Sequence, residues 1–118
     1  MTEVIITAPI TVIESSAFES CVALKHLQLP NTVIEISPYA FANLGIEKIT
    51  IPASVQKIYW SVFSKSNVKE ITFLGNMPQF LNDVFSNVTA TVYYPGDNST
   101  WTQNKLQNYG GNITWVAQ

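Results

Sequence analysis

Residues 24–41 read LKHLQLPNTVIEISPYAF, and this order of apolar and polar residues recurs three more times in the chain. The other copies are residues 1–18 (MTEVIITAPITVIESSAF), 46–63 (IEKITIPASVQKIYWSVF) and 68–85 (VKEITFLGNMPQFLNDVF). Counted from the start of each copy, positions 1, 4, 6, 10, 13, 17 and 18 are apolar in every copy. We call this pattern the repeat frame.

The copies follow one another at a nearly fixed distance. Phe18 and Phe41 are 23 residues apart, whereas Phe41 to Phe63 and Phe63 to Phe85 are 22 residues each. Self-similarity at such a period indicates a solenoid, and a period in the twenties is typical of leucine-rich repeats. We therefore expect an α/β horseshoe-type solenoid, rich in β-structure, with parallel strands. Its single domain, 1–118, contains four coils and a terminal strand with a cap: 1–23, 24–45, 46–67, 68–89 and 90–118.

Short strands are expected at frame positions 3 to 6, where polar and apolar residues alternate as they do in a half-buried strand. They cover 3–6, 26–29, 48–51 and 70–73, and a second brief extended piece follows at 33–36 and 55–58. Each frame ends in a Phe, at which we expect a tight or 3₁₀-like turn. The four rings are predicted to stack as a buried column: Phe18, Phe41, Phe63 and Phe85.

The C-terminal segment departs from the frame and is predicted to close the end of the stack. We expect strands at 91–95 and 112–116, and between them a helix at 101–108. Thr100 and Gln103 have the spacing of a capping box for this helix. The last coil of a solenoid exposes apolar surface that a terminal cap must cover. The covering side chains are expected to be Trp101, Leu106, Tyr109, Ile113 and Trp115.

Several segments resemble the BspA-like class of leucine-rich repeats. The resemblance rests on the run Leu27-Gln28-Leu29-Pro30 with Ala40-Phe41, on the matching run 49–55, and on a terminal segment marked by 91–95 and 113–115. Departures are Thr7 and Leu74 in place of Pro, and Val62 and Val84 in place of Ala. The resemblance implies a secreted or cell-surface protein that contacts host, matrix or other cell-surface proteins.

Composition argues against several function classes. The 118 residues carry a net charge of −2, with six Lys and no Arg. Because Arg is the preferred residue for phosphate and guanine contacts, nucleic-acid binding is not expected. No apolar run is long enough for a transmembrane helix, so direct membrane insertion is not expected. The single Cys21 is expected to be a small core residue, with a reactive thiol as the alternative.

No arrangement of side chains in the sequence indicates catalysis, a metal or another cofactor. His26 is the single histidine and lies at an outward strand position, so a zinc site lacks a ligand set. Glu3 and Glu70 share a column of the sheet, but two strands separate them, which is too far for a glycosidase pair. We therefore expect a protein that is not an enzyme.

The sequence favours a noncatalytic protein-binding or adhesion module. Stacked strands place frame positions 3 and 5 in two outward columns, and solenoids use such surfaces for recognition. The candidate partner-binding residues are His26, Gln28, Lys48, Thr50, Glu70, Thr72 and Tyr93. At frame positions 2 and 3 the signs of charge alternate between neighbouring coils, which fits either a cross-strand register or a contact surface.

Other interpretations stay open at this point. The outward residues could simply solvate the sheet of a structural spacer within a larger surface protein. Alternatively, Tyr39, Tyr59 and Trp60 could form a carbohydrate-binding site on the outer wall. The first coil has no coil before it, so we also expect either upstream repeats or end-to-end self-association.

Overall fold

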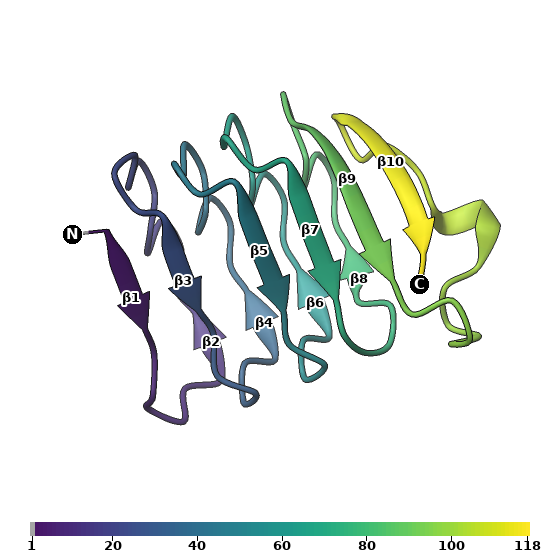
Figure 1. Cartoon of the computed structure of the whole chain (residues 1–118), viewed down its shortest axis with the longest axis horizontal. Helices are drawn as coiled ribbons and strands as arrows, with labels where there is room; N and C mark the ends of the chain where they lie inside the picture. The colour runs from purple at the N-terminus through teal and green to yellow at the C-terminus, as the bar shows by residue number, and fades with distance from the viewer. Residues whose placement is uncertain (1) are drawn as a thin grey trace.

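The computed structural model describes residues 2–118 as a β-solenoid (Figure 1). One wall contains the longer strands, all parallel, and the second wall contains two-residue strands, also parallel. The first wall is formed by β1 (Glu3–Ile5), β3 (His26–Gln28), β5 (Lys48–Ile51), β7 (Glu70–Phe73), β9 (Thr89–Tyr94) and β10 (Asn112–Ala117). The second wall is formed by β2 (Val12–Ile13), β4 (Glu35–Ile36), β6 (Lys57–Ile58) and β8 (Gln79–Phe80). The predicted leucine-rich-repeat solenoid is confirmed.

The register of the strands follows the repeat frame. Glu3 lies opposite His26, and Lys48 lies opposite Glu70, so residues at the same frame position are neighbours across the ladder. The first wall is nevertheless two sheets, because β1 pairs with β3 while β5, β7, β9 and β10 form a separate ladder. In the part of the chain that the structure describes, no ladder joins β3 to its neighbour β5. The first wall is therefore interrupted between the second and third coils.

A third ladder of hydrogen bonds runs through the turns around each Phe. The amide N–H of Phe41 donates to the carbonyl oxygen of Val62 (2.9 Å), and that of Phe63 donates to Val84 (3.0 Å). Two residues per coil in these turns have positive φ, although none is Gly: Ser16, Ser20, Tyr39, Asn43, Ser61, Lys65, Asp83 and Asn87. The expected tight turns are therefore present, and a left-handed residue recurs in each of them.

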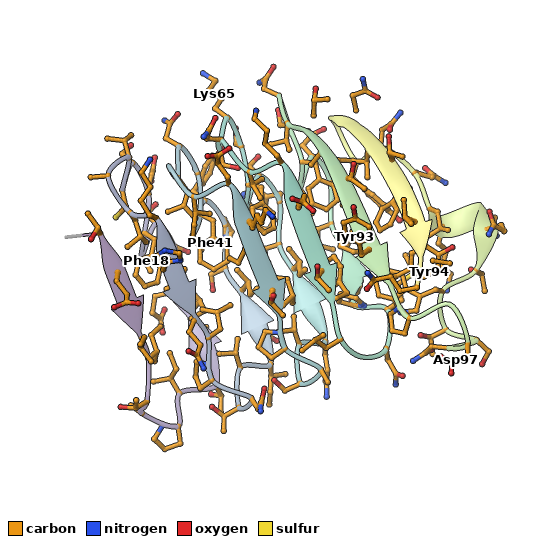
Figure 2. All side chains as sticks on the ribbon, in the orientation of Figure 1. Phe18, Phe41, Lys65, Tyr93, Tyr94 and Asp97 are labelled. Atoms are coloured by element: carbon orange, nitrogen blue, oxygen red, sulfur yellow. The ribbon has the colours of Figure 1, made fainter. Side chains whose placement is uncertain are left out.

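The predicted Phe column is present between the two walls. Successive ring centroids are 6.0, 5.4 and 5.8 Å apart from Phe18 to Phe85. Phe41, Phe63 and Phe85 are fully buried, whereas Phe18 is half-buried because its outer face has no coil beside it (Figure 2). Cys21 lies in this same first coil and is also only partly buried against the core.

The C-terminal cap is present, but the predicted helix at 101–108 is wrong. The segment contains a single 3₁₀ turn, η1 (Gln103–Lys105), whose preceding residue Thr102 makes no side-chain cap bond. Thr100 does not cap a helix either, because its hydroxyl accepts the amide of Met77 (2.8 Å) and donates to Asn98 (2.6 Å). The hydroxyl that the capping box requires is therefore hydrogen-bonded to the fourth coil instead.

Aromatic side chains of the cap cover the end of the stack, as the sequence predicted. Trp101 is 6% exposed, its indole N–H donates to the Gly75 carbonyl (2.9 Å), and its ring stacks on Tyr94 at 5.3 Å. The indole N–H of Trp115 donates to the carbonyl of Gln107 (2.9 Å). These bonds to neighbouring segments hold the irregular loop in place without a helix. The other predicted covering residues, Leu106, Tyr109 and Ile113, also pack against the core.

Candidate functional site

The outward side of the first wall carries the candidate residues on alternate strand positions. In β3 and β5, Leu27, Ile49 and Ile51 are buried, while the residues between them are exposed. This alternation follows from the strand period of two residues, which sends neighbouring side chains to opposite faces. The sequence frame therefore placed the outward columns correctly.

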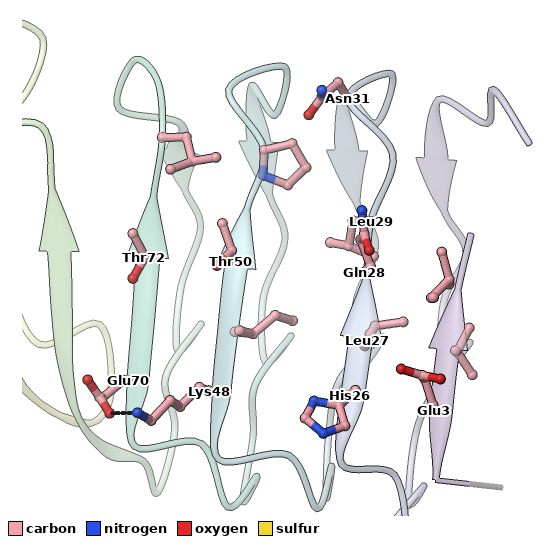
Figure 3. A pocket seen from close by; sticks show the side chains of 15 residues that line it. Glu3, His26, Leu27, Gln28, Leu29, Asn31, Lys48, Thr50, Glu70 and Thr72 are labelled. Atoms are coloured by element: carbon pink, nitrogen blue, oxygen red, sulfur yellow. Dashed lines mark ion pairs between the residues drawn. The ribbon is translucent and has the colours of Figure 1, made fainter. Parts of the chain in front are cut away.

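These strands border a groove of about 620 Å³, which we call the sheet groove (Figure 3). Six of the seven candidate residues line it: His26, Gln28, Lys48, Thr50, Glu70 and Thr72. Tyr93 lies opposite Thr72 on the neighbouring strand β9 and does not line the groove. The structure thus brings six candidates together and leaves the seventh at one side. Their role in binding stays a prediction.

The sheet groove crosses the interruption between β3 and β5. Its lining includes the inward residues Leu27 and Ile49, one on each side of the interruption. The amides of His26 and Glu70 each donate to the carbonyl of the preceding coil, at Thr2 and Glu47 respectively (both 3.1 Å). In residues 2–118 the equivalent bond from Lys48 is missing. Among the described residues, the facing edges of β3 and β5 are therefore not joined by ladder hydrogen bonds.

The titratable side chains of the groove form a mixed-charge row. Lys48 Nζ lies 3.1 Å from Glu70 Oε2, across the ladder between β5 and β7 (Figure 3). Glu3 and His26 face each other in register on β1 and β3. Exposed ion pairs contribute about 0–1 kcal/mol to stability, so the Lys48–Glu70 pair mainly fixes where the two charges lie. A partner would meet both signs of charge within one groove.

Apolar residues at the rims of the groove were missing from the candidates. Ile5 on β1 and Leu74, just after β7, line the groove and are each 55% exposed. Both depart from the repeat frame, since Ile5 stands where the other coils have polar residues and Leu74 stands where two have Pro. These departures were the signal that could have identified them. They give the groove apolar contact area beside its charges.

The outer-wall aromatics lie in a different part of the molecule. Tyr39 and Trp60 line a hollow of about 480 Å³ together with Ser61, Leu81, Asn82 and Asp83. Tyr59 does not line it. We call this feature the outer hollow.

The described residues contain no cluster of three or more His, Cys, Asp or Glu side chains close enough to hold a metal ion. Among residues 2–118, no helix has the length and apolar character needed to span a membrane.

Comparison with known proteins gives one match. A family model described as BspA type leucine-rich repeat region, with 6 copies of the repeat, matches residues 1–109. No curated protein and no solved structure matches the chain.

Proposed function

Because the chain belongs to the BspA-type leucine-rich repeat family, we propose that it is a noncatalytic module that binds a protein partner in the sheet groove. A leucine-rich-repeat solenoid is typically a scaffold rather than an enzyme. The observation that carries the proposal is the sheet groove itself, which gathers six outward polar residues over an interruption of the sheet.

The contents of the groove suit a polypeptide partner. Gln28, Thr50 and Thr72 offer hydrogen-bonding side chains to a partner in the groove. Lys48 and Glu70 offer both charges, which fix the register of a partner more than they raise its affinity. The strands sit on a close-packed core, so binding orders few additional groups and loses little entropy.

A location outside the cell is consistent with this proposal. Proteins of the BspA-type family are generally secreted or displayed at the cell surface. The partner in this proposal is a host, matrix or cell-surface protein, and the module mediates adhesion. A structural spacer is the competing role, and it requires no groove-dependent partner.

The experiment begins with capture of a partner. The full chain is immobilised, incubated with a surface-protein or matrix-protein fraction, and the retained protein is identified and its Kd measured. His26→Ala, Gln28→Ala and Lys48→Ala are then combined in one variant, whose fold is checked by circular dichroism. We expect the triple variant to bind at least about tenfold more weakly, which corresponds to about 1.4 kcal/mol.

Lys105→Ala is the matched control, because it removes one exposed lysine from the cap, outside the sheet groove. It should leave the Kd unchanged. Tyr93→Ala shows whether the contact extends beyond the groove onto β9. If the triple variant binds as tightly as the parent, the groove is not the binding site, and the spacer role is favoured.

A further inference from the structure

The outer hollow combines two exposed aromatic rings with polar side chains from three successive coils. Trp60 is 47% exposed and Tyr39 is 43% exposed. Single exposed apolar side chains are ordinary, but two exposed aromatic rings that border one hollow form a candidate contact surface for a ligand. The remaining lining residues are Ser61, Leu81, Asn82 and Asp83.

The backbone holds these side chains in a fixed array. Tyr39, Ser61 and Asp83 occupy the same frame position, with φ of 62°, 58° and 58°, in the second, third and fourth coils. The carbonyl oxygen of each accepts an amide three residues later at 3.1 Å, which closes the same turn in each coil. Trp60 and Asn82 occupy the frame position just before. The hollow is therefore built on a regular ladder of turns.

The indole of Trp60 is supported from one side. Its ring meets Tyr59 edge-on, with centroids 5.8 Å apart and an interplanar angle of 70°. The hydroxyl of Tyr59 donates to the Glu35 carboxylate (3.1 Å), and Lys57 Nζ lies 4.6 Å from the centre of the Tyr59 ring. These contacts restrict the ring of Tyr59 and thereby the indole, so a ligand that stacks on Trp60 meets a largely preorganised surface.

The chemistry of the lining selects a neutral, hydroxyl-rich ligand. Aromatic faces attract the C–H faces of a sugar ring, while carboxylate, amide and hydroxyl side chains bond its hydroxyl groups. The lining contains one carboxylate and no Lys, so an anionic ligand such as a phosphate would be repelled. The volume of about 480 Å³ lies within the usual range for small-ligand sites.

We propose that the outer hollow binds a neutral glycan, with one sugar ring stacked on Trp60 and its hydroxyl groups bonded by Asp83 and Asn82. Tyr39 borders the second sugar position, one coil away. No residue of the outer hollow lines the sheet groove, so this site is independent of the protein-binding site proposed above.

The test uses the full chain and a panel of neutral oligosaccharides built from glucose, galactose, mannose and N-acetylglucosamine. Glycans retained on an array are then titrated in solution while tryptophan fluorescence and its quenching by acrylamide are followed. Trp60 is exposed whereas Trp101 is buried, so stacking of a sugar on Trp60 should reduce quenching. We expect at least one glycan of the panel to bind with this signature.

Two variants and one control decide the assignment. Trp60→Ala should weaken glycan binding at least about tenfold, and the nearly isosteric Asp83→Asn should weaken it severalfold. Gln28→Ala, in the sheet groove, should leave it unchanged, and all three should keep the melting temperature of the parent within a few degrees. The proposal is overturned if no glycan of the panel binds, if Trp60→Ala leaves affinity unchanged, or if substitutions in the hollow affect only a protein partner.

Discussion

The two ends of the solenoid differ in how their apolar interior is covered. At the C-terminal end, Trp101, Tyr109 and Trp115 pack over Phe80 and the last coil and cover its apolar interior. At the N-terminal end, Val22 is 68% exposed and Phe18 is covered on one side only. A small hollow of about 230 Å³ opens there between Val4, Phe18 and Val22.

The difference between the two ends indicates that the coils contribute unequally to the stability of the chain. In a solenoid each coil gains most of its stability from the coils on either side of it. The coils from β5 to β10 share one continuous ladder and a cap, while β1 and β3 form a separate pair at the open end. We therefore expect substitutions to cost more toward the C-terminal end, and the following predictions measure that gradient.

The largest effect is expected within the Phe column. Phe63→Ala or Phe41→Ala should each cost about 3–5 kcal/mol of folding free energy, because each ring is fully buried and its removal leaves a cavity in the column. This cost lowers the melting temperature by about 10 °C or more. Phe18→Ala should cost clearly less, since the first ring is only partly buried. Equal melting temperatures for Phe18→Ala and Phe63→Ala would contradict the expected difference in stability between the two ends.

The next largest loss of stability is expected in the cap, where a buried tryptophan can be compared with an exposed one. Trp101→Ala removes a ring that is 6% exposed, together with its hydrogen bond to Gly75, and should cost about 3 kcal/mol. Trp60→Ala removes an exposed ring and should cost about 0.5 kcal/mol or less. Denaturant unfolding of both variants measures the difference. Similar costs for the two would show that the cap is not what completes the stack.

In solution, the isolated 118-residue chain should self-associate through its first coil. Among the described residues, the outer edge of β1 has no ladder partner, and we propose that it pairs, beside the exposed Ile5 and Val22, with the same end of a second copy of this 118-residue chain. An apolar surface next to an unpaired strand edge favours such contacts. Light scattering should show an apparent mass that rises with concentration.

Ile5→Lys combined with Val22→Lys should suppress this rise, because charges on an edge oppose pairing. A strict monomer over the whole concentration range would contradict the proposed pairing. Cross-linking through Cys21, which is in the same coil, can identify the end involved.

The smallest effect concerns pH and the cap. Burial raises the pKa of the Tyr109 hydroxyl above its ordinary value of 10.0, and this hydroxyl donates to the Lys105 carbonyl (2.6 Å). Because the folded chain holds the proton more tightly than the unfolded chain, the stabilisation is complete below pH 10 and is lost as pH rises through the folded pKa. Tyr109→Phe should therefore show a smaller fall in melting temperature above pH 10 than the parent. Parallel pH curves would contradict this.

Much of the architecture was predictable from the repeat frame. A period of 22 or 23 residues and alternation within the strands were enough to place the Phe column and the outward residues of β3 and β5. Trp101 and Trp115 were assigned to the cap because they are apolar and follow the last coil, whose exposed end must be covered.

Other features were not predictable, for identifiable physical reasons. The left-handed turn residues include Tyr39 and Lys65, which have no intrinsic preference for positive φ, so the inter-coil bonds impose that conformation. The spacing of Thr100 and Gln103 mimics a helix start, but tertiary bonds take the Thr100 hydroxyl. The outer hollow required the coils to be aligned before Ser61, Asn82 and Asp83 could be seen beside Trp60.

Amide hydrogen exchange measured by NMR tests most directly whether the first wall is interrupted between β3 and β5. Lys48 and Glu70 occupy the same frame position, yet the amide of Glu70 donates to Glu47 (3.1 Å) while that of Lys48 faces the interrupted edge. We expect the Lys48 amide to exchange at least about tenfold faster than the Glu70 amide, because it has no ladder bond to break first. Equal protection of the two amides would show a continuous ladder from β3 to β5, and with it the proposed basis of the sheet groove would fail.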